Sequence, residues 1–408
     1  MKTYDDFKSL IKTLNKYPTP TDLVYKYEFS YPDMNNYFEK KMNDNIFLKL
    51  PLLDDEKKPL LYLTNKYLFN NFKDAEIILD GLNSFNFKSM TNKEILENFI
   101  YSEIEGNLGI EGFHCNKNEI QRVRRMPYDD LTSNQEVIIK NMLEAYDYIL
   151  KEDITIKNIN TLYLIVSKNC LKLTEKLAPG QLYRDDDKHI KDTDGNIVDK
   201  GVNHTLLKKL MKSLLDYIKE KTSIENEILK PHIIHYYILY LHPYFDLNGR
   251  MARLLSHWYS FKYLPRFSLL YLNEAINNKH NKHQYFNAIV TSRETGNDIT
   301  YFLEYMADVM IKYAIIYRNN TIITDQLEGE GKLLPKSLQT TVKNILTMPK
   351  DADGFFSWKR YANFADDDYS KVLYLKHLNQ LTNYKVLSRR KVKNAYVYRL
   401  NNKRFNLY

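Results

Sequence analysis

The stretch His242-Pro-Tyr-Phe-Asp-Leu-Asn-Gly-Arg-Met-Ala-Arg253 constrains the fold of this 408-residue chain more than any other part of its sequence. Its middle, Asp246 to Gly249, predicts a tight loop. Apolar residues at helical spacing predict a helix directly after it, at Met251, Leu254, Leu255 and Trp258. The N–H groups of a first helical turn lack helical partners and the helix dipole is positive there, so the place suits a phosphate. Arg250 and Arg253, three residues apart, can clamp a polyphosphate from one helical face.

Each part of this stretch also has an ordinary explanation. A His-Pro pair before a helix is usually a loop, Asn-Gly is usually a turn, and arginines three apart usually lie on a solvated face. Seven specified residue types within twelve positions are unlikely to meet by chance, however. The combination therefore indicates a phosphate site equipped with an imidazole and a carboxylate.

The stretch resembles the signature of Fic-domain proteins, His-Pro-Phe-x-Asp-Gly-Asn-Gly-Arg-x-x-Arg. The resemblance implies transfer of AMP from ATP to a Ser, Thr or Tyr hydroxyl of a target protein. It implies that His242 is the general base, which requires a neutral imidazole near pH 7. It also implies that Asp246 holds Mg²⁺ against the phosphates, since this cation prefers oxygen ligands.

The same resemblance assigns the remaining site residues. Asn248 and Gly249 would line an anion hole, and Arg250 and Arg253 would hold the phosphates beyond the scissile bond. An aromatic near Tyr285 would contact the adenine, with a core position as the alternative.

Leu247 departs from the family pattern, which has Gly there. A Leu with φ > 0 costs energy that Gly avoids, and a Leu that must approach phosphate closely would crowd it. Tyr244 in place of Phe keeps the aromatic ring and adds a hydroxyl.

An inhibitory segment is expected upstream of this loop. Tyr101-Ser-Glu-Ile-Glu-Gly-Asn107 ends a predicted helix over residues 92–107 and is similar to the Fic inhibitory pattern Ser/Thr-x-x-x-Glu-Gly/Asn. Glu105 is expected to pair with Arg253 and to occupy the space of the ATP γ-phosphate. Ile110-Glu111-Gly112 competes, but it lacks the upstream Ser and the helical run, so Glu105 is preferred. In some relatives the equivalent Glu also activates water to remove AMP, which makes a bifunctional enzyme a variant of this hypothesis.

Composition limits the class of protein. Aromatic residues at 13% and hydrophobic residues at 44% exclude a disordered chain, and only twelve Gly and twelve Pro favour helices over turn-rich β architecture. Two cysteines without zinc spacing indicate no disulfide framework, which fits the reducing cytoplasm. The polar start and the lack of a long apolar run argue against a signal peptide and a membrane span.

We therefore expect a mostly α-helical fold with four parts. Residues 1–90 form a helical packing segment that could support a homodimer, 91–317 a Fic-like helical core, 318–334 a linker and 335–408 a winged helix. Within the core, helices are expected at 134–151, at 214–241 with a break near Pro231, and at 299–317. Asp194-Gly-Asn196 between Ile190 and Val198 predicts a hairpin. It resembles the Fic flap, which docks a target strand; an ordinary surface hairpin is the alternative.

The C-terminal module carries the positive charge of the chain. Residues 332–408 hold sixteen Lys and Arg against five Asp, a net of +11, so the rest of the chain sums to −3 against the total of +8. Three predicted helices and a basic hairpin are the winged-helix order. The predicted DNA contacts are Arg389 and Arg390 on the hairpin and, on the third helix, Lys376, His377, Gln380 and Asn383. Winged helices also bind proteins, so a DNA-binding regulator whose core binds nucleotide without efficient turnover is the competing function.

Overall fold

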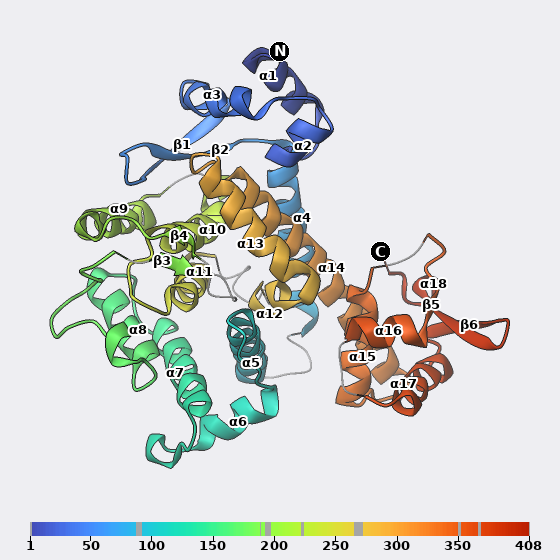
Figure 1. Cartoon of the computed structure of the whole chain (residues 1–408). Coiled ribbons are helices and arrows are strands. Elements are labelled where there is room, and N and C mark those ends of the chain that lie inside the picture. The colour runs from blue at the N-terminus through green and yellow to red at the C-terminus, as the bar shows by residue number, and fades with distance from the viewer. Residues whose placement is uncertain are drawn as a thin grey trace. The chain divides into compact units, whose positions relative to one another are not determined.

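The computed structural model describes residues 2–86, 92–187, 189–191, 197–221, 224–264, 272–349, 352–365 and 369–407. Over these residues the chain is mostly α-helical, as predicted, with a few short antiparallel strands (Figure 1). It divides into two compact units. Unit 1 comprises Met1–Glu76 and Ser89–Met310, and unit 2 comprises Ile77–Lys88 and Ile311–Tyr408. None of the described helices is long and apolar enough to cross a membrane.

The N-terminal segment packs within unit 1. Its elements are α1 (Tyr4–Thr13), α2 (Pro20–Tyr25), α3 (Tyr31–Met42), β1 (Phe47–Leu53), β2 (Pro59–Leu63) and α4 (Lys66–Asn86), which runs into unit 2. The inner faces of these elements meet in a hydrophobic cluster that includes the aromatic residues Phe7, Tyr17 and Phe47. Ile299 donates its backbone N–H to the Leu61 carbonyl at 2.9 Å, so β2 is tied to a segment more than two hundred residues later. The segment therefore shares a compact unit with the helical core.

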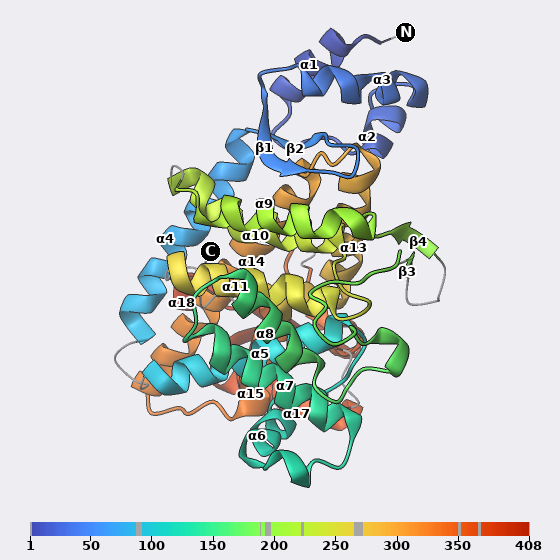
Figure 2. The same cartoon turned by 90° about the vertical axis from the view of Figure 1, so that its left-hand side faces the viewer.

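The helical core of unit 1 surrounds one buried helix. Its helices are α5 (Asn92–Ile110), α6 (Lys117–Arg125), α7 (Asn134–Ile149), α8 (Ile156–Ser167), α9 (Leu207–Lys219), α10 (Ile224–Leu241), α11 (Asn248–Tyr263), α12 (Leu272–Asn277), α13 (Lys279–Glu294) and the part of α14 (Thr300–Gly329) up to Met310, with 3₁₀ turns at Tyr128–Asp130, Leu173–Glu175 and His204–Leu206. Figure 2 shows α10 between α9 and α11. Since α11 is buried almost all round, down to 0% exposure at Trp258, the helix predicted after the His242 loop is the centre of this core.

Two helix boundaries differ from the prediction. The expected break near Pro231 is wrong: the chain breaks between α9 and α10, and Pro231 lies inside α10. The predicted end of α5 at Asn107 is also wrong, because the helix continues through Gly109 to Ile110. Its stop is Gly112, with φ +86° and a bond from the Phe113 N–H to the Leu108 carbonyl at 2.9 Å, the Schellman arrangement.

A two-stranded antiparallel hairpin forms where the flap was predicted. Its strands are β3 (His189–Lys191) and β4 (Ile197–Lys200), and Ile190 pairs with Asp199. The predicted tip, Asp194 to Asn196, lies outside the described residues. The observed strands agree with a hairpin at this position.

Unit 2 contains the basic C-terminal module. Its elements after α14 are α15 (Lys336–Thr347), β5 (Phe356–Ser357), α16 (Trp358–Ala365), α17 (Lys371–Asn383), β6 (Leu387–Val392), β7 (Ala395–Leu400) and α18 (Asn402–Phe405), with sheet order β5-β7-β6. The predicted caps are present: Ser357 and Ser370 accept from the N–H groups of Arg360 and Leu373.

Two predictions about this unit need correction. The expected linker over 318–334 is helical up to Gly329, because α14 runs far beyond the predicted end of the helix at Tyr317. The apolar spacing of the third predicted helix also indicates that Val372 faces inward with Leu378 and Leu381, but Val372 is 75% exposed, whereas Leu378 and Leu381 are fully buried. The buried face of α17 thus starts with Tyr374 rather than with Val372.

Candidate active site

The His242 loop has two left-handed residues at its ends. His242 follows α10 directly with φ +50°, and its N–H still donates to the Ile238 carbonyl at 3.0 Å. Leu247 has φ +72° and ψ 9° and is the residue before the first turn of α11. Leu247 was expected either to have a positive φ or to crowd a phosphate, and the structure shows the positive φ. Its side chain is only 2% exposed, so it points into the protein core.

The side chain of Asn248 closes the loop. Its Nδ2 donates to the Tyr244 carbonyl at 2.8 Å, and its Oδ1 accepts from the Tyr244 N–H at 2.9 Å. The Tyr244 backbone uses the amide oxygen and one of the two amide N–H groups of Asn248, so its backbone N–H and the second amide N–H are the donors left for an anion. The N–H groups at the start of α11 have no acceptor within the helix and are suited to bind an anion. An anion hole made by these backbone groups stays a prediction.

Asp246 lies exposed on the same loop, with Oδ1 accepting from the Leu247 N–H at 2.7 Å. Partial desolvation raises the pKa of this carboxyl, and Glu111 and Glu175 raise it further, while Arg250 opposes them. Among the described residues, no three or more His, Cys, Asp or Glu side chains are grouped so that they could hold a metal ion. A single carboxylate fits Mg²⁺, which typically binds one or two carboxylates together with substrate phosphates.

Both arginines of the loop are buried rather than solvated, with Arg250 5% and Arg253 2% exposed. The Arg250 guanidinium lies over the Phe113 ring at 5.2 Å, and among the described residues its buried Nε has no hydrogen-bond partner. Arg253 donates from Nε to Asn107 Oδ1 at 3.0 Å and from Nη2 to Glu111. The two guanidiniums thus line the N-terminal end of α11, as a phosphate clamp requires.

The pairing expected between Glu105 and Arg253 is wrong, because Glu111 makes it. Six residues advance a helix by about 9 Å, so Glu105 lies nearly two turns upstream of the residue that reaches the arginine. Asn107 occupies the position four before Glu111 where the inhibitory pattern has Ser or Thr, and it binds the same arginine. The sequence did carry a signal for Glu111, namely a polar residue four positions before a Glu-Gly pair.

The Glu111 carboxylate occupies the anion-binding end of α11. A Cβ on Gly249 would lie 2.5 Å from Glu111 Oε1, so Gly249 leaves room for the carboxylate against the first helical turn. The Glu111 side chain is 25% exposed. Desolvation raises its pKa, but Arg253, Arg250 and Lys282 outweigh that effect and hold the pKa below its ordinary value. Glu111 is therefore an anion bound where a phosphate was predicted.

Three polar contacts, one turn apart, fasten α5 to the buried face of α11. Besides Asn107 and Glu111, Glu103 approaches His257 Nε2 at 3.0 Å, and it accepts from the Asn273 N–H at 3.0 Å. Glu103 is fully buried. The helix that presents Glu111 is thus anchored two turns upstream, on both α11 and α12.

Tyr285 does not present its ring as an adenine contact. It is 1% exposed, its hydroxyl lies 2.8 Å from His235 Nε2, and burial raises its pKa to about 12. The core alternative is therefore the one observed. The neighbouring Phe286 is 43% exposed. The sequence places no carboxylate at metal-ligand spacing from His232 and His235, which favours core or surface histidines over ligands, and each is 2% exposed.

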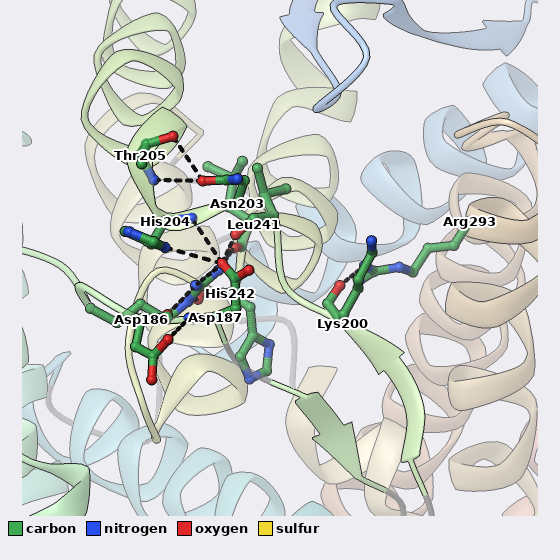
Figure 3. A network of polar contacts seen from close by, with 11 residues as sticks. Asp186, Asp187, Lys200, Asn203, His204, Thr205, Leu241, His242 and Arg293 are labelled. Carbon is green, nitrogen blue, oxygen red and sulfur yellow. Dashed lines mark hydrogen bonds and ion pairs between the residues drawn. The ribbon is translucent and has the colours of Figure 1, made fainter.

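Arg184 contacts the segments that flank the hairpin of β3 and β4, and Arg293 contacts the last residue of β4. Arg184 donates from Nε to the His242 carbonyl at 2.7 Å, and Arg293 donates to the Lys200 carbonyl at 2.9 Å. Figure 3 shows Lys200 beside Arg293, and His242 in the same view as the residues that flank the hairpin. The sequence carried a signal for Arg184, since this residue ends the Pro-Gly-Gln-Leu-Tyr-Arg segment just before the predicted hairpin; its burial, which obliges the charge to find acceptors, appears only in the structure.

In unit 2 the predicted nucleic-acid contacts fall into two groups. Lys376, Arg389 and Arg390 are exposed, whereas His377 is 5% exposed and bonds Thr341, so His377 was wrongly expected to enter a groove. Both exposed arginines also have partners within the module: Arg389 donates to Asn379 at 2.9 Å and Arg390 pairs with Asp353 at 2.8 Å. Both arginines lie within β6 rather than at the hairpin tip.

Comparison with known proteins agrees with this site. Residues 154–260 match the Fic/DOC family, a stretch that contains α8, the His242 loop and most of α11. The chain therefore carries a Fic/DOC family domain, and domains of this family commonly transfer a nucleoside monophosphate to proteins. No curated protein matches the sequence.

One solved structure shares the fold, and others are similar over part of the chain. A Fic family protein from Desulfovibrio desulfuricans G20 superimposes with a TM-score of 0.53 at 16% identity, covering 83% of this chain and 97% of the other. Fic-1 from C. elegans gives 0.43 at 17% identity over 60% of this chain and 69% of the other. A Fic domain containing signaling protein from Bacteroides thetaiotaomicron VPI-5482 gives 0.43 at 14% identity over 65% and 99%.

Proposed function

We propose that this protein transfers AMP from Mg-ATP to a hydroxyl of a target protein and that Glu111 restrains the reaction. The observation that carries the proposal is the Glu111 carboxylate bound by Arg253 against Gly249. A carboxylate and a phosphate compete for the same donors, since both are anions that bind guanidinium and the N–H groups of a first helical turn. The protein thus carries an internal anion in its candidate phosphate site.

The reaction needs one proton acceptor and several anion-binding groups. His242 would accept the proton of a Ser, Thr or Tyr hydroxyl while its oxygen bonds to the α-phosphorus of ATP. The bond from that phosphorus to the bridging oxygen breaks, and pyrophosphate leaves with its electron pair. Arg250, Arg253 and the first N–H groups of α11 would bind the phosphates and offset their charge.

Mg²⁺ would neutralise charge on the phosphate oxygens when bound with the nucleotide. Asp246 is the residue that would hold it, since its carboxylate lies exposed on the loop that precedes the phosphate-binding turn. The raised pKa of this carboxyl predicts weaker metal binding as the pH falls toward the acid range, because protonation removes the ligand charge.

Labelled ATP tests the reaction type. The Glu111→Gly variant, incubated with Mg²⁺ and ATP labelled at the α-phosphate, is expected to become labelled on protein, whereas ATP labelled at the γ-phosphate leaves no label. The additional change His242→Ala should abolish labelling without abolishing nucleotide binding, because it removes the proton acceptor alone. Label from the γ-phosphate, or labelling that survives His242→Ala, would contradict AMP transfer by this site.

We further propose that residues 335–408 form a winged helix that binds DNA. The order of one helix, a short strand, two helices and a hairpin supports it, as does the exposure of Arg389, Arg390, Lys391 and Lys393 on or beside β6. Such cations would contact phosphates and position the module without reading bases.

Salt dependence tests this second proposal. Binding of the full chain to a random DNA duplex should weaken steeply with salt, and changing Arg389 and Arg390 to Ala should reduce the logarithmic slope by about 1 for each phosphate that the variant no longer binds. Lys403→Ala, an exposed cation on α18, is the matched control and should change the slope less. Equal slopes for all variants would favour a protein partner for this module.

A further inference from the structure

We infer that Arg184 is a positioning residue that joins the flap hairpin to the catalytic histidine, so that both move as one body. The inference rests on the proposed AMP transfer for its meaning, but its geometry stands apart from that reaction. Arg184 lies between α8 and β3, in the segment that leads into the hairpin. Its guanidinium contacts neither the loop carboxylate Asp246 nor the phosphate end of α11 in any bond that the described residues make.

The guanidinium binds main-chain carbonyls from three separate segments. Nε donates to His242 at 2.7 Å, Nη1 donates to Asp186 at 2.6 Å, and Nη2 donates to Val202. Asp186 precedes β3 and Val202 follows β4, so these two carbonyls flank the hairpin, while the third belongs to the proposed base. Nη2 also lies 3.5 Å from the Leu241 carbonyl, and the Arg184 backbone N–H donates to the Pro243 carbonyl at 3.0 Å. Figure 3 shows Asp186 and His242 close together in this network.

Because Arg184 is buried, its guanidinium depends on acceptors within the protein. The Arg184 side chain is 0% exposed, and Asp187, the carboxylate paired with it, lies 3.8 Å away and is 62% exposed. Burial lowers the pKa of the guanidinium, which reflects the cost of desolvating the charge. Carbonyl oxygens offset that cost, and a rigid fork of donors fixes the positions of the segments that supply them.

Gly201, directly after β4, allows the chain to approach both the Arg184 guanidinium and the His242 side chain. A Cβ at this position would lie 2.6 Å from Arg184 Nη2 and 3.0 Å from His242 Cβ. His242 has φ +50°, a backbone conformation that a non-glycine residue keeps only when its surroundings hold it. The hydrogen bond from Arg184 Nε to the His242 carbonyl is one of the contacts that hold it. A target strand that docks on the hairpin would thus meet a base already held in place.

Arg184→Met and Arg184→Lys in the Glu111→Gly background test the role in transfer. We expect Arg184→Met to lower the rate of AMP incorporation at saturating ATP by about tenfold or more, as removal of a positioning group does, with the affinity for Mg-ATP unchanged. Lys keeps a charge but lacks the fork, so it should restore the rate only in part. The matched control is Arg293→Met, which removes the bonds to the Lys200 and Leu239 carbonyls and the contact with the Tyr240 ring. It should lower the rate less.

Hydrogen exchange on the full chain gives a readout that needs no activity. Arg184→Met should speed exchange in two regions together, residues 197–205 and 242–247, whereas Arg293→Met should affect the first region alone. Exchange that changes in neither or only one region in Arg184→Met, or a rate within twofold of the parent, would overturn the inference. Loss of nucleotide affinity together with the rate would also overturn it, since that pattern marks general unfolding. If the parent variant transfers no AMP, the proposed function fails while the exchange result still decides the role of Arg184.

Discussion

At the scale of single residues, Leu247 combines two opposing contributions to stability. Its left-handed backbone costs roughly 1–2 kcal/mol for a residue other than Gly, whereas its side chain is buried at 2% exposure. Truncating a buried Leu to Ala costs about 2–5 kcal/mol. Burial therefore outweighs backbone strain, which accounts physically for a Leu where the Fic pattern has Gly.

The substitution Leu247→Gly tests this balance. It should lower the free energy of unfolding by roughly 1–3 kcal/mol, the difference between the lost burial and the relieved strain, measured by chemical denaturation. A more stable variant would show that strain dominates. Leu254→Gly, at a fully buried position inside α11, is the control and should cost more because no strain is relieved there.

Glu304 predicts how the stability of unit 1 depends on pH. Its carboxylate accepts from the Tyr17 N–H at 3.1 Å and from Asn65 Nδ2 at 2.7 Å, and burial raises its pKa to about 7. Because the folded state binds this proton more tightly than the unfolded chain, stability is fully present below pH about 4.5 and is lost as the pH rises through about 7. The contribution is at most about 3 kcal/mol.

Denaturation of wild type and Glu304→Gln between pH 5 and 8 checks this contribution. The wild type should lose stability across the range and the variant, which cannot titrate there, should lose less. Parallel pH profiles for the two proteins would assign the dependence to other groups.

At the scale of elements, α5 explains why the inhibitory residue was assigned to the wrong glutamate. The helix was expected to end at Asn107, but Gly106 and Gly109 both face α12 and allow it to approach. The helix therefore continues, and Glu111 rather than Glu105 reaches Arg253. Local sequence signals cannot distinguish a glycine that ends a helix from one that packs against a neighbour.

The same close approach predicts the effect of Gly106→Ala. A Cβ there would lie 2.3 Å from the Glu274 N and 2.4 Å from the Asn273 carbonyl carbon, which are backbone atoms that cannot turn aside. We expect α5 to move away from α12, with a loss of roughly 1–3 kcal/mol in stability and a rise in AMP incorporation as Glu111 withdraws. Gly109→Ala is the matched control, since it meets only the Asn277 side chain. Unfolding and label incorporation, measured on both variants, should separate them; equal behaviour would contradict the packing argument.

At the scale of the whole molecule, the sequence predicted the helical class, the loop with its following helix and the order of the C-terminal elements. It could not predict contacts between segments far apart in the chain. Lys41 and Asp298, both almost fully buried and 2.8 Å apart, join the N-terminal segment to the core across 257 residues. Such pairs depend on tertiary packing, as do the bonds of Arg253 to Asn107 and Glu111.

The most direct test of restraint by Glu111 compares two glutamates on one segment. AMP incorporation should be measured for wild type, Glu111→Ala and Glu105→Ala with Mg²⁺ and ATP labelled at the α-phosphate. We predict a rate for Glu111→Ala about tenfold or more above wild type, equivalent to at least about 1.4 kcal/mol, and a rate for Glu105→Ala near that of wild type. A rise in Glu105→Ala alone, or no incorporation by any of the three proteins, would contradict restraint by Glu111.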